Sequence, residues 1–255
     1  MKIFISARVD RKEIERLKQA GADIEFGGYG VTGEKLGEAE LTSKLADVDI
    51  AITEFENITE QVLSKATKLK YLACLRNEPG ASVDMAAAKK KKLPILFAPG
   101  RNAISVAEYT IGLMLAATRF IAQSHHLLRY TDELTSVNYN DKQGERGKIT
   151  SEWSLDPGAP FQRFQGEELF EKTAGIVGFG MVGQEIGRRL HALGMNLLVF
   201  DPYVTDEKLK EFSAKKVDLE SISRESDFVI MAAKVTEETR GMFGAKNFEL
   251  MKQNA

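Results

Sequence analysis

The stretch from Lys172 to Tyr203 constrains the fold more than any other, because it sets a glycine pattern between two apolar runs. It reads KTAGIVGFGMVGQEIGRRLHALGMNLLVFDPY. The first run, Ala174–Val177, has the length of a buried strand, and an amphipathic helical repeat follows the glycines. The second run, Leu197–Phe200, ends at an aspartate. A strand, a helix and a second strand in this order predict a parallel βαβ unit.

The glycines of this stretch predict a dinucleotide site. Gly178, Gly180 and Gly183 are spaced G-x-G-x-x-G. The first permits a tight turn, the second lets backbone amides approach a pyrophosphate, and the third lets the helix pack closely on the strand. Asp201 is placed to accept hydrogen bonds from the adenosine ribose and to repel a 2′-phosphate, which favours NAD over NADP. The alternative is a plain βαβ unit whose glycines only form a turn.

The first hundred residues alternate short apolar runs with amphipathic segments. Such alternation predicts an α/β domain with a doubly wound parallel sheet, in which ligands bind beyond the carboxyl ends of the strands. The loops at 76–80 and 99–102 are therefore the ones expected to carry function. The predicted strands are Lys2–Ser6, Asp23–Phe26, Asp49–Thr53, Tyr71–Leu75 and Pro94–Ala98, with helices near Arg11–Ala20, Glu34–Leu45, Thr59–Ala66 and Val83–Lys91.

A second α/β domain is expected after residue 102. The pattern predicts one long helix over 103–129, then a polar surface loop over 131–165 with Trp153, Phe161 and Phe164 as aromatic anchors. The predicted domains are therefore 1–102 and 103–255. After Asp201 the pattern predicts helices near Asp206–Phe212, Leu219–Arg224 and Ala245–Met251, and strands at Lys215–Val217 and Asp227–Ala232.

Composition narrows the function classes. Of the 255 residues, 35 are Lys or Arg and 37 are Asp or Glu, so the near-neutral charge gives no reason to expect nucleic-acid or membrane binding. Cys74 is the single cysteine, which favours a reducing cytoplasm and a buried inert thiol over a nucleophile. His125 and His126 have no partner ligands at useful spacing, so no metal site is predicted.

The motifs together resemble the D-isomer-specific 2-hydroxyacid dehydrogenases, whose best known branch is phosphoglycerate dehydrogenase. The resemblance covers essentially the whole chain and rests on PGRNA at 99–103, VAE at 106–108, GIVGFGMVGQEIGRRL, VFDPY, SDFVIMAAKVTEETRGMF and FELMK. It implies a flavodoxin-like substrate domain, a Rossmann NAD-binding domain, and a homodimer formed through the nucleotide domain and its long helix. The nucleotide domain is expected to be incomplete, because the sequence stops within the family pattern.

The resemblance also assigns site residues by position. Arg76, Asn77 and Glu78 would line the loop that holds the substrate carboxylate. The cofactor would contact Gly178, Phe179, Gly180, Met181, Val182, Gly183, Asp201, Pro202, Ala232, Ala233 and Lys234. Where the family often has His-x-Pro, this chain has Ala232-Ala233-Lys234, so the usual imidazole is absent. Lys234 is expected to be either solvent-exposed or a phosphate contact.

The function implied by the resemblance is an NAD-dependent oxidoreductase that interconverts a small 2-hydroxy acid and its 2-keto acid. The family's catalytic Arg, Glu and His follow a later strand, and no residue up to Ala255 stands at those motif positions. We therefore expect no catalytic residue within the chain, and the 255 residues alone to be inactive. The alternative is a non-catalytic NAD(H) sensor that resembles the C-terminal-binding corepressors.

Overall fold

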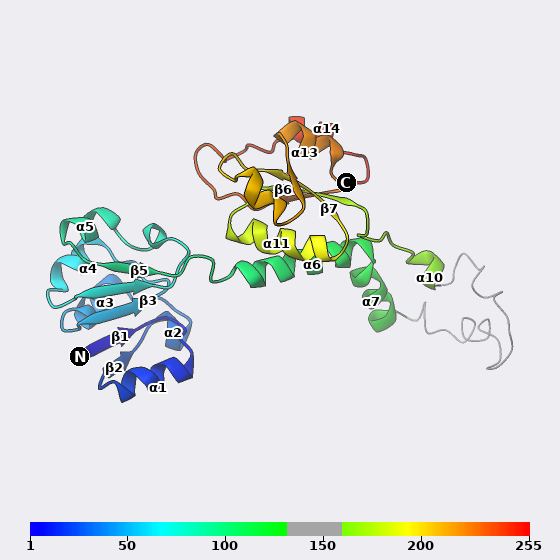
Figure 1. Ribbon diagram of the computed structural model, residues 1–255. Coiled ribbons are helices and arrows are strands. Elements are labelled where there is room, and N and C mark those ends of the chain that lie inside the picture. Colours follow the sequence, from blue (N-terminus) through cyan, green and yellow to red (C-terminus); the bar gives the residue numbers. More distant parts are fainter. Residues whose placement is uncertain (132–159) are drawn as a thin grey trace. The chain divides into compact units, whose positions relative to one another are not determined.

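The computed structural model describes residues 1–131 and 160–255 (Figure 1). The chain forms two compact units, Met1–Arg101 and Asn102–Ala255, called unit 1 and unit 2 below. Each unit has its own parallel sheet, so the predicted α/β class is confirmed. Most of the predicted polar loop at 131–165, including Trp153, lies outside the described residues.

Unit 1 contains a five-stranded parallel sheet in the order β2-β1-β3-β4-β5, which is the flavodoxin-like doubly wound order. All five predicted strands form, within a residue of their predicted bounds at each end. They are β1 (Lys2–Ile5), β2 (Asp23–Phe26), β3 (Ile50–Thr53), β4 (Tyr71–Cys74) and β5 (Ile95–Phe97). The helices are α1 (Arg11–Gln19), α2 (Tyr29–Thr32), α3 (Glu38–Leu45), α4 (Glu60–Lys65) and α5 (Met85–Lys90), with a 3₁₀ turn at Pro79–Ala81.

Side-chain caps define where several of these helices begin. Asp10 accepts a hydrogen bond from the Lys12 amide at 2.7 Å, and Asp84 accepts one from the Ala87 amide at 2.9 Å. The predicted helix at Glu34–Leu45 is wrong at its start. The chain first forms the short helix α2, which ends at Gly33 with φ of 80°, and α3 begins only at Glu38.

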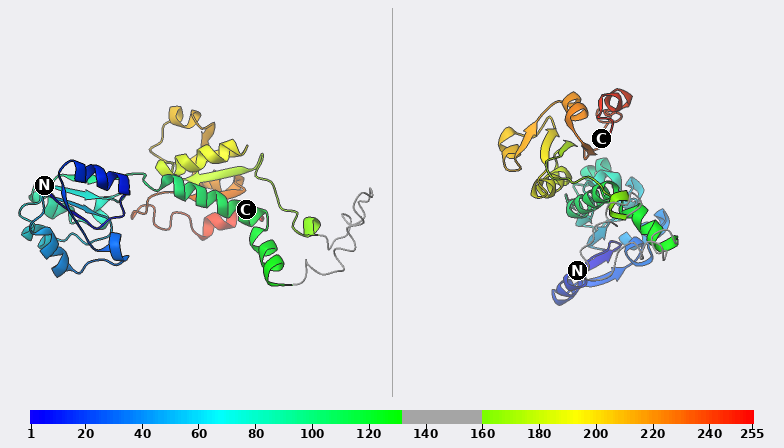
Figure 2. Two further views of the ribbon diagram at one scale, coloured as in Figure 1. Left: turned by 90° about the horizontal axis from the view of Figure 1, so that it is seen from below. Right: turned by 90° about the vertical axis from the view of Figure 1, so that its right-hand side faces the viewer.

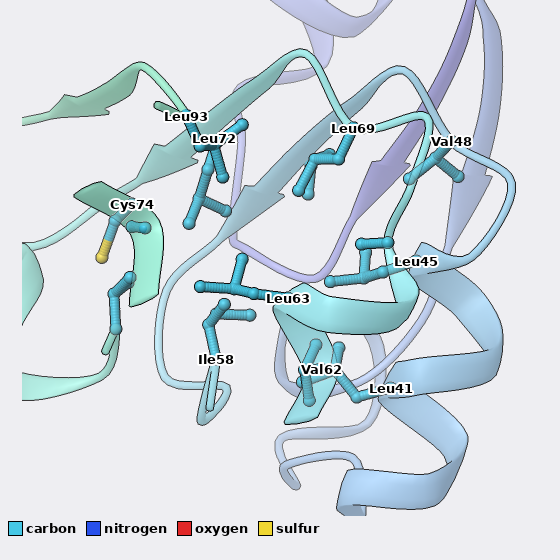
Figure 3. Packing of buried hydrophobic residues seen from close by; sticks show 14 of the residues in the cluster. Leu41, Leu45, Val48, Ile58, Val62, Leu63, Leu69, Leu72, Cys74 and Leu93 are labelled. Atoms are coloured by element: carbon cyan, nitrogen blue, oxygen red, sulfur yellow. The ribbon is translucent and has the colours of Figure 1, made fainter. Parts of the chain in front are cut away.

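The main buried cluster of unit 1 lies on one face of its sheet, while Ile3 and Ile5 of β1 are buried on the other. Leucine and valine side chains of α3 and α4 pack there against Leu72 and Cys74 of β4, and all are fully buried (Figure 3). The other face is more open, since Tyr71 is 47% exposed and Leu96 is 60% exposed. Successive side chains of a strand point to opposite faces, so β4 buries Leu72 and Cys74 on one face and exposes Tyr71 on the other. At the edge strand β5, Leu96 and Phe97 are both exposed.

Unit 2 contains a four-stranded parallel sheet in the order β8-β7-β6-β9, which corresponds to the first four strands of the Rossmann order 3-2-1-4-5-6. The strands are β6 (Thr173–Val177), β7 (Asn196–Phe200), β8 (Ala214–Lys216) and β9 (Phe228–Met231). The helices after residue 159 are α10 (Pro160–Arg163), α11 (Met181–Ala192), α12 (Asp206–Lys210), α13 (Leu219–Glu225) and α14 (Ala245–Leu250).

The single long helix predicted over 103–129 is wrong. The segment forms two helices, α6 (Ala103–Thr118) and α7 (Ile121–Tyr130), bent by 68° at the break. The backbone of Phe120 lies in the left-handed region with φ of 52°. Its ring packs near that of Phe164, with centroids 6.5 Å apart. The backbone at Gly166 lies against the Thr118 carbonyl, where a Cβ would come within 1.8 Å. Tertiary contacts at the end of α6 therefore interrupt a sequence whose apolar pattern continues.

Helix α6 packs along α11 through buried residues that include Ala107 and Met114 (Figure 2). Its opposite side leaves Tyr109 70% exposed and Leu113 54% exposed. Within 1–131 and 160–255, no single helix is long and apolar enough to cross a bilayer. Helices α6 and α7 reach that length and composition only as the bent pair.

Candidate functional site

The turn after β6 has the geometry expected of the glycine pattern. Gly178 has φ of 91°, and a Cβ there would lie 2.5 Å from the Ala233 backbone. A Cβ on Gly183 would lie 2.3 Å from the Gly178 carbonyl oxygen, so the predicted close packing of helix on strand is confirmed. Both glycines are required because backbone occupies the space that a side chain would fill.

Gly180 differs from its two neighbours in the pattern. It is the N-cap of the twelve-residue helix α11, it is exposed, and nothing lies within 4 Å of the position of a Cβ. The amides of Met181, Val182 and Gly183 lie in the first turn of the helix, where no carbonyl inside the helix can accept from them. This open end, with its partial positive charge, fits the pyrophosphate of a dinucleotide.

Asp201 links the end of β7 to the glycine turn. Its Oδ2 accepts a hydrogen bond from the Phe179 amide at 2.6 Å, and its Oδ1 accepts from the Tyr203 and Val204 amides at 2.8 and 3.1 Å. A carboxylate has about four acceptor positions, so one remains on Oδ2. Asp201 therefore has a structural role that the sequence did not reveal, and it retains capacity for a ribose hydroxyl.

Some of the remaining predicted cofactor residues contribute backbone to the turn, and others have exposed side chains around it. The Phe179 side chain is buried against Phe212, with ring centroids 5.1 Å apart, so only its backbone faces the turn. Ala232 donates from its amide to the Val177 carbonyl at 2.8 Å, which brings Ala233 against Gly178. Met181, Pro202 and Lys234 are exposed around this edge. The structure thus brings all eleven predicted positions to the carboxyl end of the unit 2 sheet.

The predicted substrate residues lie at the corresponding edge of unit 1. Arg76 follows β4 and stacks on Phe55, with its Cζ 4.7 Å from the ring centroid. The Asn77 side chain accepts a hydrogen bond from the Gly100 amide at 3.0 Å, so the loops after β4 and β5 are joined. Glu78 is exposed and precedes the 3₁₀ turn. The two loops that sequence analysis singled out are therefore in contact.

The loop after β3 carries charged groups that sequence analysis missed. Glu54 is 6% exposed and forms an ion pair with Arg101, in which Nη2 and Oε1 are 2.6 Å apart. Glu56 is fully buried, and its Oε1 accepts from the Tyr29 amide at 3.0 Å. Its Oε2 has no hydrogen-bond partner among the described residues. The alternating run TEFE at the end of β3 was the available signal, because two acids rarely enter a buried segment without partners.

The three histidines all belong to unit 2, and none is part of its glycine turn. His125 and His126 lie on α7, where both rings are near Tyr130. His191 is exposed near the end of α11, ten residues beyond Met181, or about 15 Å of helix rise. No group of three potential metal ligands occurs in the described part of the chain. Neither unit 1 nor the glycine turn of unit 2 therefore supplies an imidazole of its own for acid–base chemistry.

The sequence of this chain is similar to those of several known proteins. Residues 111–255 match the family described as D-isomer specific 2-hydroxyacid dehydrogenase, NAD binding domain. The whole chain is 32% identical to D-3-phosphoglycerate dehydrogenase of Methanocaldococcus jannaschii, of which it spans 43%. It is 30% identical to the putative 2-hydroxyacid dehydrogenase YoaD of Bacillus subtilis, of which it spans 68%.

Solved structures support the fold. A putative D-isomer specific 2-hydroxyacid dehydrogenase from Polaromonas superposes over 98% of this chain and 70% of its own, with a TM-score of 0.75 and 22% identity. At that identity the likeness concerns the architecture.

Proposed function

The chain belongs to the D-isomer-specific 2-hydroxyacid dehydrogenase family, and on that premise we propose that its two sheet edges serve one oxidoreductase reaction. Unit 2 would hold NAD(H), and unit 1 would hold a small 2-hydroxy or 2-keto acid. The observation that carries the proposal is the glycine turn of unit 2, where Gly180 leaves the end of α11 open while Gly178 and Gly183 are enclosed.

The cofactor assignment is the NAD of this family. The first-turn amides of α11 would bind the pyrophosphate, and the free acceptor position of Asp201 would bind the adenosine ribose. When bound, the nicotinamide accepts or supplies the hydride. We propose that NADH binds more tightly than NADPH, since the Asp201 carboxylate would face a 2′-phosphate and Pro202, rather than an arginine, follows it.

The acid would bind at the unit 1 edge through Arg76, with Asn77 and Glu78 in the same loop. The Arg76 guanidinium is oriented by the Phe55 ring, and a guanidinium forms two parallel hydrogen bonds with a carboxylate. The Asn77 hydrogen bond to Gly100 holds the loop in place. These contacts support Arg76 as the group that binds the substrate carboxylate.

We further propose that the polypeptide Met1–Ala255 binds its ligands but does not turn them over by itself. Hydride removal from a hydroxy acid requires a base for the hydroxyl proton, and such help is typically worth about 10²–10⁴-fold in rate. All three histidines lie on α7 or near the far end of α11. Neither these histidines nor any other residue up to Ala255 stands at the family's catalytic motif positions.

The test measures binding and turnover separately. NADH and NADPH binding to Met1–Ala255 would be measured by calorimetry, and NADH oxidation would be followed with hydroxypyruvate and glyoxylate. The M. jannaschii phosphoglycerate dehydrogenase, assayed with 3-phosphohydroxypyruvate, is the active control. We expect NADH to bind without turnover. Turnover comparable to the control would overturn the proposal, and tighter NADPH binding would overturn the role of Asp201.

A second candidate function is an NAD(H) sensor without chemistry, which the placement of the histidines favours. The two functions differ at unit 1. A dehydrogenase lineage retains a site for the 2-keto acid at Arg76, whereas a sensor has no need of one. Binding of hydroxypyruvate in the presence of NADH, lost in Arg76→Gln, would support the first. Unchanged NADH binding with no acid binding would support the second.

We also propose that the chain forms a homodimer through α6. The side of α6 away from α11 exposes Val106, Tyr109 and Leu113, which are spaced three and four residues apart, and contiguous exposed apolar side chains mark interaction surfaces. Sedimentation velocity should show a dimer for the wild type and a monomer for Leu113→Glu. Val31→Glu, at a 61% exposed position of unit 1, is the control that should remain dimeric.

A cytoplasmic location stays a prediction from the single cysteine.

A further inference from the structure

Two aromatic rings form a fixed pair at the carboxyl edge of the unit 1 sheet. Tyr29, in α2, meets Phe55, after β3, edge-on with centroids 4.4 Å apart. The Tyr29 backbone is held by the hydrogen bond to Glu56, and the Gly30 amide donates to the Ser6 carbonyl at 2.7 Å. A Cβ on Gly30 would lie 2.5 Å from the Ala7 carbonyl oxygen, so this turn is packed directly on the end of β1.

Each ring of the pair carries an arginine. Arg76 stacks on Phe55, and Arg8, which follows β1, stacks on Tyr29 with its Cζ 5.2 Å from the centroid. Stacking holds a guanidinium over the ring and leaves its in-plane N–H groups directed outward. The two cations therefore come from different strands but are oriented by one rigid pair of rings.

The acids at this edge do not neutralise these two arginines. Neither Arg8 nor Arg76 has a carboxylate within 4.0 Å in residues 1–131 and 160–255, whereas Glu54 is paired with Arg101. Glu56 is fully buried and accepts its hydrogen bond from the Tyr29 amide. Two unpaired guanidinium groups at the carboxyl ends of parallel strands are suited to an anionic ligand.

We propose that Arg8 recognises a second anionic group on the acid substrate. The chain would then select 2-keto acids with two anionic groups, either two carboxylates or a carboxylate and a phosphate, over monocarboxylic ones. This inference rests on the proposed function, in which Arg76 binds the carboxylate next to the keto group. Arg8 is a binding and specificity residue in this scheme, and Tyr29 and Phe55 position the two cations.

Matched ligands test the proposal directly. With NADH present, calorimetry on Met1–Ala255 would compare 2-oxoglutarate with 2-oxopentanoate, which has the same chain length but lacks the second carboxylate. A second pair, 3-phosphohydroxypyruvate and hydroxypyruvate, distinguishes phosphate from carboxylate. We expect the dianionic member of at least one pair to bind about 10- to 100-fold more tightly, the usual range for a hydrogen bond to a charged group.

Variants assign the selectivity to Arg8. Arg8→Gln should remove the preference and change binding of the monoacid less than about twofold, because Arg8 is exposed and makes no ion pair within the described residues. Arg11→Gln removes the same charge three residues away at the start of α1 and should change nothing. Phe55→Leu keeps both charges but removes one ring, and it should shift the Arg76 Nε–H resonance and weaken both acids.

The outcomes separate the inference from the proposed function. Equal affinity for the acids of both pairs, or an equal loss in Arg8→Gln and Arg11→Gln, would overturn the inference and leave the proposed function standing. Unaltered NADH binding with no affinity for any acid would overturn the acid-binding part of the proposed function, and the inference with it. Thermal unfolding of each variant checks that the fold is retained.

Discussion

The amino ends of the two sheets are alike, and their carboxyl ends are not. In unit 1, Asp49 precedes β3 and accepts a hydrogen bond from the amide of Lys2, the first residue of β1, at 2.8 Å. In unit 2, Asp227 precedes β9 and accepts one from the amide of Thr173, the first residue of β6, at 2.8 Å. In both units, an aspartate therefore joins the first strand of the sheet to a neighbouring strand, β3 in unit 1 and β9 in unit 2.

At the carboxyl ends the two units use different materials. Unit 2 presents backbone: glycines, a helix terminus and the Ala232-Ala233 segment, with Asp201 holding the turn. Unit 1 presents side chains: stacked Arg8 and Arg76, and the Glu54–Arg101 pair. Backbone amides suit a pyrophosphate that is the same in every reaction, whereas side chains can be adapted to one particular acid. The amino edge is thus alike in both sheets and supports folding, whereas the carboxyl edge of each sheet is specialised for its own ligand.

The largest expected effect tests whether the units fold independently. Leu72 of β4 is fully buried, so Leu72→Ala should destabilise unit 1 by about 2–5 kcal/mol. Hydrogen exchange should rise in β1, β3 and β4 and stay unchanged in β6 and β7. Leu96→Ala, at an exposed position of the adjacent strand β5, is the control and should have little effect. Equal loss of protection in both sheets would contradict the independence of the units.

The next effect tests the claim that the unit 2 edge is built from backbone. Gly178→Ala should cost about 1–2 kcal/mol for the left-handed backbone and about 1–3 kcal/mol for overpacking against Ala233. Gly180→Ala has open space around the new methyl group and should leave stability unchanged, while weakening NADH binding. Urea unfolding and NADH titration of both variants check this, and a stable Gly178→Ala protein would refute it.

A smaller effect concerns the double role of Asp201. Asp201→Asn keeps the shape but lacks one acceptor oxygen, so the Phe179 amide or the Tyr203 and Val204 amides lose a partner. We expect a loss of about 1–3 kcal/mol in unit 2, together with weaker discrimination against NADPH. Lost discrimination at full stability would mean that the backbone hydrogen bonds contribute little to folding.

The smallest effect tests the likeness of the amino ends through pH. At Asp49 the hydrogen bonds from the Lys70 side chain and the Lys2 amide lower the carboxyl pKa. At Asp227 burial favours the neutral form, but the hydrogen bonds from Lys252 and Thr173 outweigh it and also hold the pKa below the usual 3.8. Each carboxylate therefore stabilises its unit fully above pH 3.8, and this contribution is lost as pH falls through the lower folded value.

Asp49→Asn and Asp227→Asn should accordingly each destabilise one unit at neutral pH, by similar amounts. The difference from wild type should shrink as the pH falls below 3.8. Urea midpoints across this range measure it, with Asp23→Asn, an exposed aspartate at the start of β2, as a control. A difference that grew on acidification would mean that the folded state holds these groups in their neutral form.

The central strands β1, β3, β4, β6 and β7 were predictable because buried parallel strands are continuous apolar runs, and the glycine spacing places the ligand edge in unit 2. The break after Thr118 was not predictable, since the apolar pattern runs on through Phe120. It arises where the Gly166 backbone and the Phe164 ring meet the end of α6. The helix predicted at Glu34–Leu45 was misjudged at its start, because Gly37 is the N-cap of α3 and the helix begins only at Glu38.

The sequence alone determined the α/β class, the two sheets and the glycine turn, because these depend on the spacing of residues that are close together along the chain. Tertiary structure alone decided that Asp201 holds the glycine turn, that Glu54 pairs with Arg101, and that Arg8 and Arg76 share one ring pair. Those groups are brought together from the ends of strands far apart in the chain. The periodicity of the sequence does not show which strand ends become neighbours, because that depends on strand order. Strand order is set by how the helices pack across the sheet.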